Sequence, residues 1–549
     1  MSIKLRNDVT IRGLKYDNYE INILIYADDI TAILEDETDA KQLLKCLKLF
    51  EKISGLKINQ SKSEGMWLGI KKKSKRKPLL IKWPPLIKLL GVYIGYDEDL
   101  RDENNFREKI NNIKLKLNIW KQRDLTIFGK ILIIKTFAIS QLLYVASVYH
   151  IPDNILKEVQ ALIYMFLWNG RTHKVKQRVV IQDFELGGCK MIDLFEINKV
   201  QKIKIVQRYL SSSKGAWKHT MKTILGKSDL TLFLKSNFNL PAANITPFYS
   251  DVLRFWKEVK YNNESSVEDI QNQYIWYNDK IKIDKKSIYS KYLIDKEILQ
   301  IADIISNTGF CVSFDEVCQG KGIDRSYFML FSGITKAIPL KWKNILRGKA
   351  KVAVKLDCFI DIKGEKQDLL KVKGNTIYSS LIFKKLDHSK AHKRFSTQFN
   401  IAEHEWKAIY LLPHNIKISN IARELSYKIL HNFIATNKLL FKMKIIDSPR
   451  CNFCNLYEQT TPHLFYSCLT VKTFWYSITE WLHTEHNIIT NILLKDILFG
   501  HQMDDHSNLL NIVIFYARLY IMNCKVQNKE LKMDDFNSFF QKQLLVNIY

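Results

Sequence analysis

Two apolar runs flank an acidic pair early in the chain. Residues 21–25 and 30–34 are rich in isoleucine and leucine, and Tyr26-Ala27-Asp28-Asp29 lies between them. Two β-prone segments with so short a connection are typical of a tight hairpin. The pattern therefore predicts that Asp28 and Asp29 lie at a turn.

A helical period follows this hairpin. Apolar side chains recur on one helical face within residues 40–50, Asp36 is suited to cap the start of the helix, and Gly55 is suited to end it. Residues 56–68 then predict short strands. Residues 89–95 predict a further strand bounded by glycines, which permit close approach of another backbone.

Three more helical patterns occupy residues 102–170. Apolar side chains recur at helical spacing in residues 106–120, 128–149 and 155–167. The second pattern contains the most membrane-like run of the chain, residues 131–149, but a lysine and several polar residues interrupt it. This interruption favours a buried amphipathic helix over a membrane span.

Helical periodicity continues to the C-terminus, with interruptions at residues 211–215 and 320–333. The whole pattern predicts an α+β fold that is mostly α-helical. We expect four regions: a small mixed region at 1–100, a helical region at 101–210, a helical connector at 211–440 and a C-terminal module at 441–549.

Composition indicates the kind of partner. The chain of 549 residues has 84 lysines and arginines against 56 aspartates and glutamates, a net charge of +28. Such an excess favours an anionic polymer, because each cation placed on a phosphate releases a counterion. Nucleic acid is therefore a better expected partner than a membrane. The N-terminus has no apolar signal core and the nine cysteines are scattered, which predicts a nuclear or cytoplasmic protein that is not secreted.

The densest basic segment has six cations within seven residues. They are Lys71, Lys72, Lys73, Lys75, Arg76 and Lys77. Like charges crowded in this way repel one another, so they predict a solvated loop. Phosphate binding, a nuclear localisation signal and simple solvation are the three interpretations that the composition leaves open.

The acidic pair has its own chemistry. Adjacent carboxylates repel each other unless a cation lies between them. Mg²⁺ prefers hard oxygen ligands, and a two-metal site stabilises the attacking and leaving oxygens of a phosphoryl transfer. Asp28 and Asp29 therefore predict a Mg²⁺-binding catalytic pair, with a solvated acidic turn as the alternative.

A second constellation lies near the C-terminal end. Cys451, Cys454, His463 and Cys468 form a C-x₂-C-x₈-H-x₄-C pattern. Thiolate and imidazole ligands favour zinc, and four protein ligands leave no position for water. The pattern predicts a structural Zn²⁺ site, and chance spacing is the alternative.

The residues around the acidic pair carry a family resemblance. Tyr26-Ala27-Asp28-Asp29, residues 50–59 (Phe-Glu-Lys-Ile-Ser-Gly-Leu-Lys-Ile-Asn) and Lys62-Ser63-Glu64 together resemble the palm of reverse transcriptases from LINE-type (non-LTR) retrotransposons. Residues 120–130 and 166–170 resemble the thumb of this family.

Residues 430–475 extend this resemblance, because they look like the zinc-binding domain that ends many of these enzymes. The resemblance implies that the four regions are a partial palm, a thumb, a connector and a zinc-binding domain. It also implies an RNA template and a DNA primer or target as partners.

The resemblance implies roles for single residues as well. Asp28 and Asp29 hold catalytic Mg²⁺, and Lys62 lies near the phosphates of the nucleotide, with an ordinary surface lysine as the alternative for Lys62. Nucleic-acid contacts are implied for Tyr26 beside the primer end, the basic segment (Lys71, Lys72, Lys73, Lys75, Arg76 and Lys77), Gly91 in a primer-grip hairpin, and Arg123 and Lys130 in the thumb.

In this family the first catalytic aspartate and the template-gripping fingers lie upstream of the matched residues, so we expect the chain to be N-terminally truncated. It would be an RNA-directed DNA polymerase if the missing polymerase part joined it in trans. The alternative is a catalytically inactive remnant that still binds RNA or DNA. A structural assembly factor with an incidental basic surface is a third hypothesis, so the sequence leaves open whether the chain is an enzyme.

Overall fold

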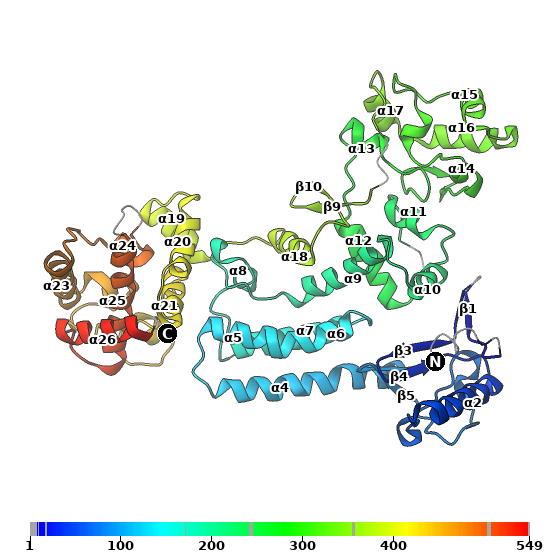
Figure 1. Cartoon of the computed structure of the whole chain (residues 1–549). Coiled ribbons are helices and arrows are strands. Elements are labelled where there is room, and N and C mark those ends of the chain that lie inside the picture. Colours follow the sequence, from blue (N-terminus) through cyan, green and yellow to red (C-terminus); the bar gives the residue numbers. More distant parts are fainter. Residues whose placement is uncertain are drawn as a thin grey trace. The chain divides into compact units, whose positions relative to one another are not determined.

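The computed structural model describes residues 8, 10–16, 19–170, 172–240, 245–353, 357–501 and 507–546 (Figure 1). The chain divides into two units, each made of separate segments. Unit 1 comprises Met1–Lys109, Leu142–Pro152 and Ile197–Ser380, and unit 2 comprises Ile110–Gln141, Asp153–Glu196 and Leu381–Tyr549. These boundaries differ from the four regions expected from the sequence, whose division stays a prediction.

Unit 1 begins with short strands and one long helix. Its elements up to residue 109 are β1 (Leu14–Tyr16), β2 (Tyr19–Ile21), β3 (Ile23–Tyr26), β4 (Asp29–Ala32), α2 (Glu37–Ser54), β5 (Leu86–Leu89), β6 (Val92–Gly95), α3 (Glu98–Asp102) and the start of α4 (Glu108–Lys121). Its later elements are α6 (Ser140–Ala146), most of α9 (Leu194–Leu210), α10 (Ala216–Leu225), α11 (Leu230–Lys235), α12 (Pro247–Val259), α13 (Val267–Gln271), β7 (Lys282–Ile283), β8 (Lys286–Ser287), α14 (Lys291–Asp295), α15 (Phe314–Lys321), α16 (Phe328–Ala337), α17 (Leu340–Leu346), β9 (Phe359–Ile362), β10 (Glu365–Asp368) and most of α18 (Gly374–Phe383).

Unit 2 has no strand among its described residues. Its helices are the rest of α4, α5 (Ile127–Ile133), α7 (Asp153–Leu167), α8 (Gln177–Val180), α19 (Lys390–Phe399), α20 (Glu405–Asn415), α21 (Asn420–Leu430), α22 (Asn437–Lys442), α23 (Leu469–His486), α24 (Leu494–Phe499), α25 (Ser507–Gln527) and α26 (Met533–Val546). The described strands form five two-stranded antiparallel sheets, all in unit 1. The predicted α+β, mostly helical fold is confirmed.

The acidic hairpin packs on the helix that follows it (Figure 1). Strands β3 and β4 pair antiparallel, with Tyr26 opposite Asp29. Ile23 on the inner face joins a small core with Ile11, Leu43 and Leu47, the last two from α2. Burial of these apolar side chains fixes the inner face of the hairpin.

Helix α2 has the predicted ends. The Asp36 carboxylate accepts hydrogen bonds from the backbone N–H groups of Thr38 and Asp39, and Gly55 ends the helix with a left-handed φ of 73°. Asp39 is buried and also accepts hydrogen bonds from the Arg12 backbone and guanidinium, at 3.1 and 3.3 Å. The residues before the hairpin are thereby attached to the first turn of α2.

Two predicted strand segments differ from the structure. Residues 56–68 form a loop with one 3₁₀ turn, because the Asn59 side chain accepts the Lys62 N–H at 3.2 Å and closes the turn. Residues 89–95 are not one strand. Leu90 and Gly91 take positive φ values of 46° and 82° and form a tight turn, so β5 and β6 pair as a hairpin.

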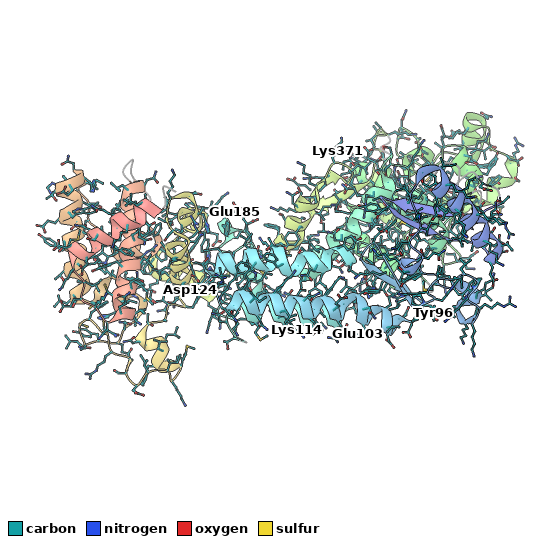
Figure 2. The ribbon with its side chains drawn as sticks, turned by 60° about the horizontal axis from the view of Figure 1, so that its bottom comes forward. Tyr96, Glu103, Lys114, Asp124, Glu185 and Lys371 are labelled. Carbon is teal, nitrogen blue, oxygen red and sulfur yellow. The ribbon has the colours of Figure 1, made fainter. Side chains whose placement is uncertain are left out.

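The three helical patterns of residues 102–170 are confirmed, and the first begins with a π-helical segment, Glu103–Arg107. The second pattern contains a π-helical segment, Ile134–Ile139, between α5 and α6. The Thr136 and Ser140 hydroxyls donate to backbone carbonyls four residues earlier, an interaction that perturbs regular helix geometry. Within unit 2, Lys114 of α4 (labelled in Figure 2) pairs with Glu158 of α7 at 3.3 Å.

Two helical stretches in the described part of the chain are long and apolar enough to cross a membrane, Ile127–Ala146 and Asn508–Gln527. Length and composition alone place them in this class, and core helices of soluble proteins satisfy the same criteria. Most of the second stretch is buried, and it supplies Val513, Ile514 and Ile521 to the core of unit 2.

A buried histidine makes unit 2 sensitive to acid. His431, at the end of α21, lies 2.8 Å through Nε2 from the Gly187 carbonyl. Burial lowers its pKa to about 4, against an ordinary value of 6.5. As pH falls from 6.5 to 4, His431 takes up a proton in the unfolded chain before it does so in the folded one. The stability that the neutral, buried His431 allows is therefore present above pH 6.5 and is lost toward pH 4.

Because of His431, we expect the free energy of unfolding of unit 2 to be about 1–2 kcal/mol lower at pH 5 than at pH 7, as measured by chemical denaturation. The His431→Gln variant should lose that part of the pH dependence, whereas His483→Gln, at an exposed histidine of the same unit, should retain it. Equal pH dependence in both variants would show that His431 is not the titrating group.

Candidate metal centres and nucleic-acid surface

The structure places Asp28 and Asp29 at the tip of the β3–β4 hairpin. The turn consists of Ala27 and Asp28, and Asp29 is the first residue of β4. Ala27 has a φ of 52°, a left-handed conformation that costs a residue with a Cβ about 1–2 kcal/mol. Both carboxylates are exposed, and within the described ranges no third metal-binding side chain joins them. Among the described residues, the tip therefore offers two metal ligands.

The outer face of the same hairpin is apolar and uncovered within its unit. Leu24 is 44% exposed and Tyr26 is 68% exposed, and the strand register places both on the face opposite to Ile23. A two-stranded sheet is marginal by itself and gains stability from further strands or from a covered face. The structure thus brings Tyr26 together with Asp28 and Asp29, and all three side chains are exposed.

Lys62 makes no described interaction with this tip. It ends the 3₁₀ turn Gln60–Lys62 and is exposed. No ion pair or hydrogen bond between described side chains connects it to Asp28 or Asp29. Its predicted contact with nucleotide phosphates stays a prediction.

The basic segment is anchored to a pair of tryptophans. All six of its cations are exposed. Trp67 donates a 2.7 Å hydrogen bond to the Arg76 carbonyl, stacks on Trp83 with ring centroids 5.0 Å apart, and has the Lys71 ammonium 5.7 Å above its ring. The segment is therefore tethered by its backbone, while its charges face solvent where a phosphate chain can reach them.

Gly91 occupies the turn of the β5–β6 hairpin. The Tyr144 hydroxyl of α6 donates a hydrogen bond to the Leu90 carbonyl, and a Cβ at Gly91 would lie 3.5 Å from the Tyr144 ring. Asn105 supports the hairpin through hydrogen bonds with both backbone groups of Tyr93, at 2.8 and 2.9 Å. These hydrogen bonds fix the turn, and the positive φ at position 91 favours glycine there.

The two predicted thumb cations differ. Arg123 is exposed in the turn after α4. Lys130 is only 7% exposed, and its ammonium donates a 2.8 Å hydrogen bond to the Asn169 side chain. Burial lowers the pKa of Lys130. This position does not fit the predicted phosphate contact, because the ammonium is already bound inside unit 2.

The four predicted zinc ligands converge. One donor atom from each of Cys451, Cys454, His463 and Cys468 lies within 4.8 Å of all the others. The Cys451 and Cys468 sulfurs are 4.0 Å apart, and Cys454 Sγ lies 3.4 Å from His463 Nε2. Tetrahedral Zn²⁺ with its usual bond lengths would place such pairs about 3.8 and 3.6 Å apart. The residues present therefore fit a closed structural zinc site.

Local structure prepares these ligands. Asn455, with a left-handed φ of 55°, lets the chain turn back so that its N–H donates to the Cys451 carbonyl at 2.9 Å. His463 begins a π-helical turn, His463–Ser467, and Cys468 caps α23. One turn thus supplies the first two ligands and a helix start supplies the other two.

The local environment acts differently on the two thiols Cys454 and Cys468. Burial opposes ionisation of Cys454, but hydrogen bonds from the backbone of Leu456 and Tyr457 outweigh it and lower the pKa of Cys454. Burial raises the pKa of Cys468 to about 11, and it lowers the pKa of His463 so that the imidazole is neutral. A bound divalent cation would replace the thiol protons.

Two further side chains support the ligands. Gln459, which is fully buried, donates to Cys451 Sγ at 3.6 Å and accepts the Asn437 N–H at 3.1 Å. Asn437 also donates to the Arg450 carbonyl at 2.6 Å. Such supporting hydrogen bonds orient metal ligands. The sequence pattern contains no signal for this function of Gln459, because its spacing from the cysteines is not part of a ligand motif.

The zinc cluster belongs to the main core of unit 2. Cys451 and Cys468 are fully buried and pack in one apolar cluster with Phe465 and Trp475. The Trp475 indole donates a 2.7 Å hydrogen bond to the Phe465 carbonyl. Loss of the metal is therefore expected to disturb the core and not only a surface loop.

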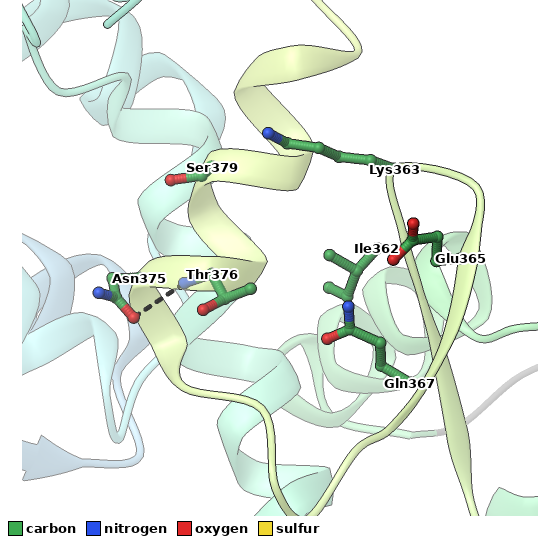
Figure 3. A pocket seen from close by; sticks show the side chains of 7 residues that line it. All are labelled: Ile362, Lys363, Glu365, Gln367, Asn375, Thr376 and Ser379. Atoms are coloured by element: carbon green, nitrogen blue, oxygen red, sulfur yellow. Dashed lines mark hydrogen bonds between the residues drawn. The ribbon is translucent and has the colours of Figure 1, made fainter.

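A separate hollow lies in unit 1 between the β9–β10 hairpin and α18 (Figure 3). It has a volume of about 340 Å³ and is lined by Ile362, Lys363, Glu365, Gln367, Asn375, Thr376 and Ser379. Its lining combines opposite charges with amides and hydroxyls, and none of the predicted site residues contributes to it.

Comparison with known proteins agrees with this geometry. Residues 388–475 match the family described as "zinc-binding in reverse transcriptase". The chain is also 26% identical over 293 residues to the Transposon TX1 uncharacterized 149 kDa protein of Xenopus laevis. This similarity covers 51% of the chain and 22% of that relative. The predicted resemblance to the C-terminal region of a non-LTR retrotransposon reverse transcriptase is therefore confirmed.

Proposed function

We propose that the chain supplies part of the active site and much of the nucleic-acid grip of a retrotransposon RNA-directed DNA polymerase. The observation that carries this proposal is the exposed Asp28–Asp29 pair at a hairpin tip, in a chain whose C-terminal part matches a reverse-transcriptase zinc-binding family. An acidic pair held out by a strained turn is typical of a site built for a cation.

In this proposal Asp28 and Asp29 hold Mg²⁺, which, when bound, stabilises charge on the oxygens of the transferred phosphoryl group. Tyr26, exposed beside Asp29, contacts the primer end or the nucleotide. Lys62 provides a cation for the phosphates. A third carboxylate from another segment completes the site, and the apolar outer face of the hairpin is the surface on which that segment packs.

A catalytically inactive, nucleic-acid-binding remnant is the second candidate. The observation that favours it is that the described residues provide only two carboxylates at the tip. Two metal ions that share two exposed carboxylates would be bound weakly. Both candidates require RNA or DNA as partner, a nuclear or cytoplasmic location and no membrane insertion.

Nucleic-acid binding by the basic segment is tested by its salt dependence. We expect the triple variant Lys72→Gln, Lys73→Gln, Lys75→Gln to bind an RNA–DNA hybrid about ten-fold more weakly or worse, and to lower the slope of log affinity against log salt by about 0.7–0.9 for each lost phosphate contact. Fluorescence anisotropy at several salt concentrations measures both quantities.

The matched control replaces three exposed lysines of unit 1, Lys285, Lys286 and Lys341, with glutamine. It removes the same charge from another part of the unit, so its slope and affinity should change much less. Equal losses in both triple variants would mean that binding follows net charge alone and that the basic segment has no special part in it.

A further inference from the structure

A second group of metal-binding side chains lies at the beginning of the family-matched region. His388 precedes α19, His392 lies in its first turn, and Glu403 lies in the loop before α20. One donor atom from each of the three residues lies within 4.8 Å of the other two. None of them belongs to the cysteine cluster.

The two imidazoles face one carboxylate. His392 Nε2 lies 3.2 Å from one Glu403 oxygen, and His388 Nε2 lies 3.7 Å from the other. The rings stack with centroids 4.3 Å apart and an interplanar angle of 29°, and both Nε2 atoms lie near the Glu403 carboxylate. Three donor atoms on one side leave the opposite side of a bound ion open.

His392 is held in a fixed orientation. Its ring is 3% exposed, stacks on Trp406 at 4.3 Å, and makes a 3.0 Å hydrogen bond through Nδ1 with the Tyr410 hydroxyl. A hydrogen bond on one ring nitrogen commonly orients a histidine that binds metal through the other. The same burial lowers the pKa of His392.

The charges and exposure also suit a cation. An imidazole that binds a metal ion is neutral, so two imidazoles and one carboxylate would supply a single negative charge. A divalent ion would then retain one positive charge and could bind water or another anion. The Glu403 side chain is 73% exposed, which gives solvent access. Imidazole with carboxylate suits zinc, nickel, copper and iron(II).

We propose that His388, His392 and Glu403 form a second divalent transition-metal site, distinct from the closed cysteine site and open to water. In the metal-bound form both Nε2 atoms and one Glu403 oxygen are ligands, and His392 Nδ1–H donates to the Tyr410 oxygen. The ion would join the start of α19 to the loop that precedes α20. A histidine–glutamate hydrogen-bonded pair without metal is the competing explanation.

The experiment titrates Co²⁺ into the purified full chain after its cysteine site has been loaded with one equivalent of Zn²⁺. Cobalt bound by thiolates gives a sulfur-to-metal charge-transfer band, whereas cobalt bound by imidazole and carboxylate gives none. We expect one further equivalent of Co²⁺ to bind without that band. Calorimetry under the same conditions measures its dissociation constant.

Two variants and one control identify the ligands. His388→Ala and Glu403→Gln should weaken the binding of the second metal ion, Co²⁺, at least ten-fold and leave the binding of the first, Zn²⁺, unchanged. Glu403 is exposed, so its variant is expected to retain the fold. His404→Ala removes an exposed neighbouring histidine outside the cluster and should bind both metals normally. The proposal is overturned if the zinc-loaded wild type binds no second ion, or if both variants bind it as the wild type does.

Discussion

Replacing Cys451 with serine should abolish stoichiometric zinc binding and unfold the C-terminal part of unit 2. Cys451 is fully buried, its thiolate would be one of four ligands, and it packs in the same core as Phe465 and Trp475. Structural zinc contributes about 10–16 kcal/mol in small zinc-binding peptides, which exceeds the stability of most domains. Metal analysis, near-ultraviolet circular dichroism and limited proteolysis measure the loss.

The matched control is Cys524→Ser. Cys524 is also buried in the core of unit 2, but it does not belong to the four-ligand cluster. We expect this variant to lose some stability through its added polarity and to retain one zinc per chain. Removal of zinc from the wild type by a strong chelator should reproduce the Cys451→Ser phenotype. A folded, protease-resistant Cys451→Ser protein would disprove the structural function of the metal.

Replacing Asp28 with asparagine should reduce DNA synthesis about 1,000-fold or more when the chain is combined with a reverse-transcriptase segment that carries the upstream catalytic aspartate and the fingers. The substitution removes one metal-ligand charge and almost nothing else. Because Asp28 is exposed at a turn, the free energy of unfolding should change by less than about 0.5 kcal/mol. Asp29→Asn should have the same effect on synthesis.

Primer extension and thermal denaturation, measured on the same preparations, separate catalysis from folding. Asp99→Asn is the control, since Asp99 is an exposed acidic residue of the same unit at the start of α3. It should leave synthesis and stability unchanged. Synthesis that survives both Asp28→Asn and Asp29→Asn would remove the acidic pair from the mechanism.

Local patterns predicted the features that local residues determine. Two β-prone runs and a short turn predicted the β3–β4 hairpin, and the cap at Asp36 and the end at Gly55 predicted α2. The four zinc ligands converge because tight turns and helix starts bring each sequence-adjacent pair together. In each case the interacting residues are near in sequence.

Other features depend on residues that meet only in the fold. Lys130 is charged and was expected on a nucleic-acid surface, but Asn169, 39 positions away, accepts its hydrogen bond inside unit 2. Gln459 supports the zinc cluster through contacts that no spacing rule describes. The four-residue separation of His388 and His392 was a usable signal for a metal site, but Glu403 completes that site from another loop.

Local sequence patterns did not predict the division of the chain into two units either. Each unit is assembled from three separate segments, so the chain passes between the units five times. Periodicity and linker composition detect breaks such as residues 211–215, between α9 and α10, but they do not reveal which distant segments share a core. Tertiary packing decides that, through apolar contacts of high sequence separation.

Primer extension by the purified chain with Mg²⁺, alone and with the complementing upstream segment, tests most directly whether Asp28 and Asp29 are part of a shared active site. We predict no incorporation by the chain alone, and incorporation that appears when the complementing segment is added and disappears with Asp28→Asn. Incorporation by the chain alone, or complementation that Asp28→Asn leaves intact, would contradict the account.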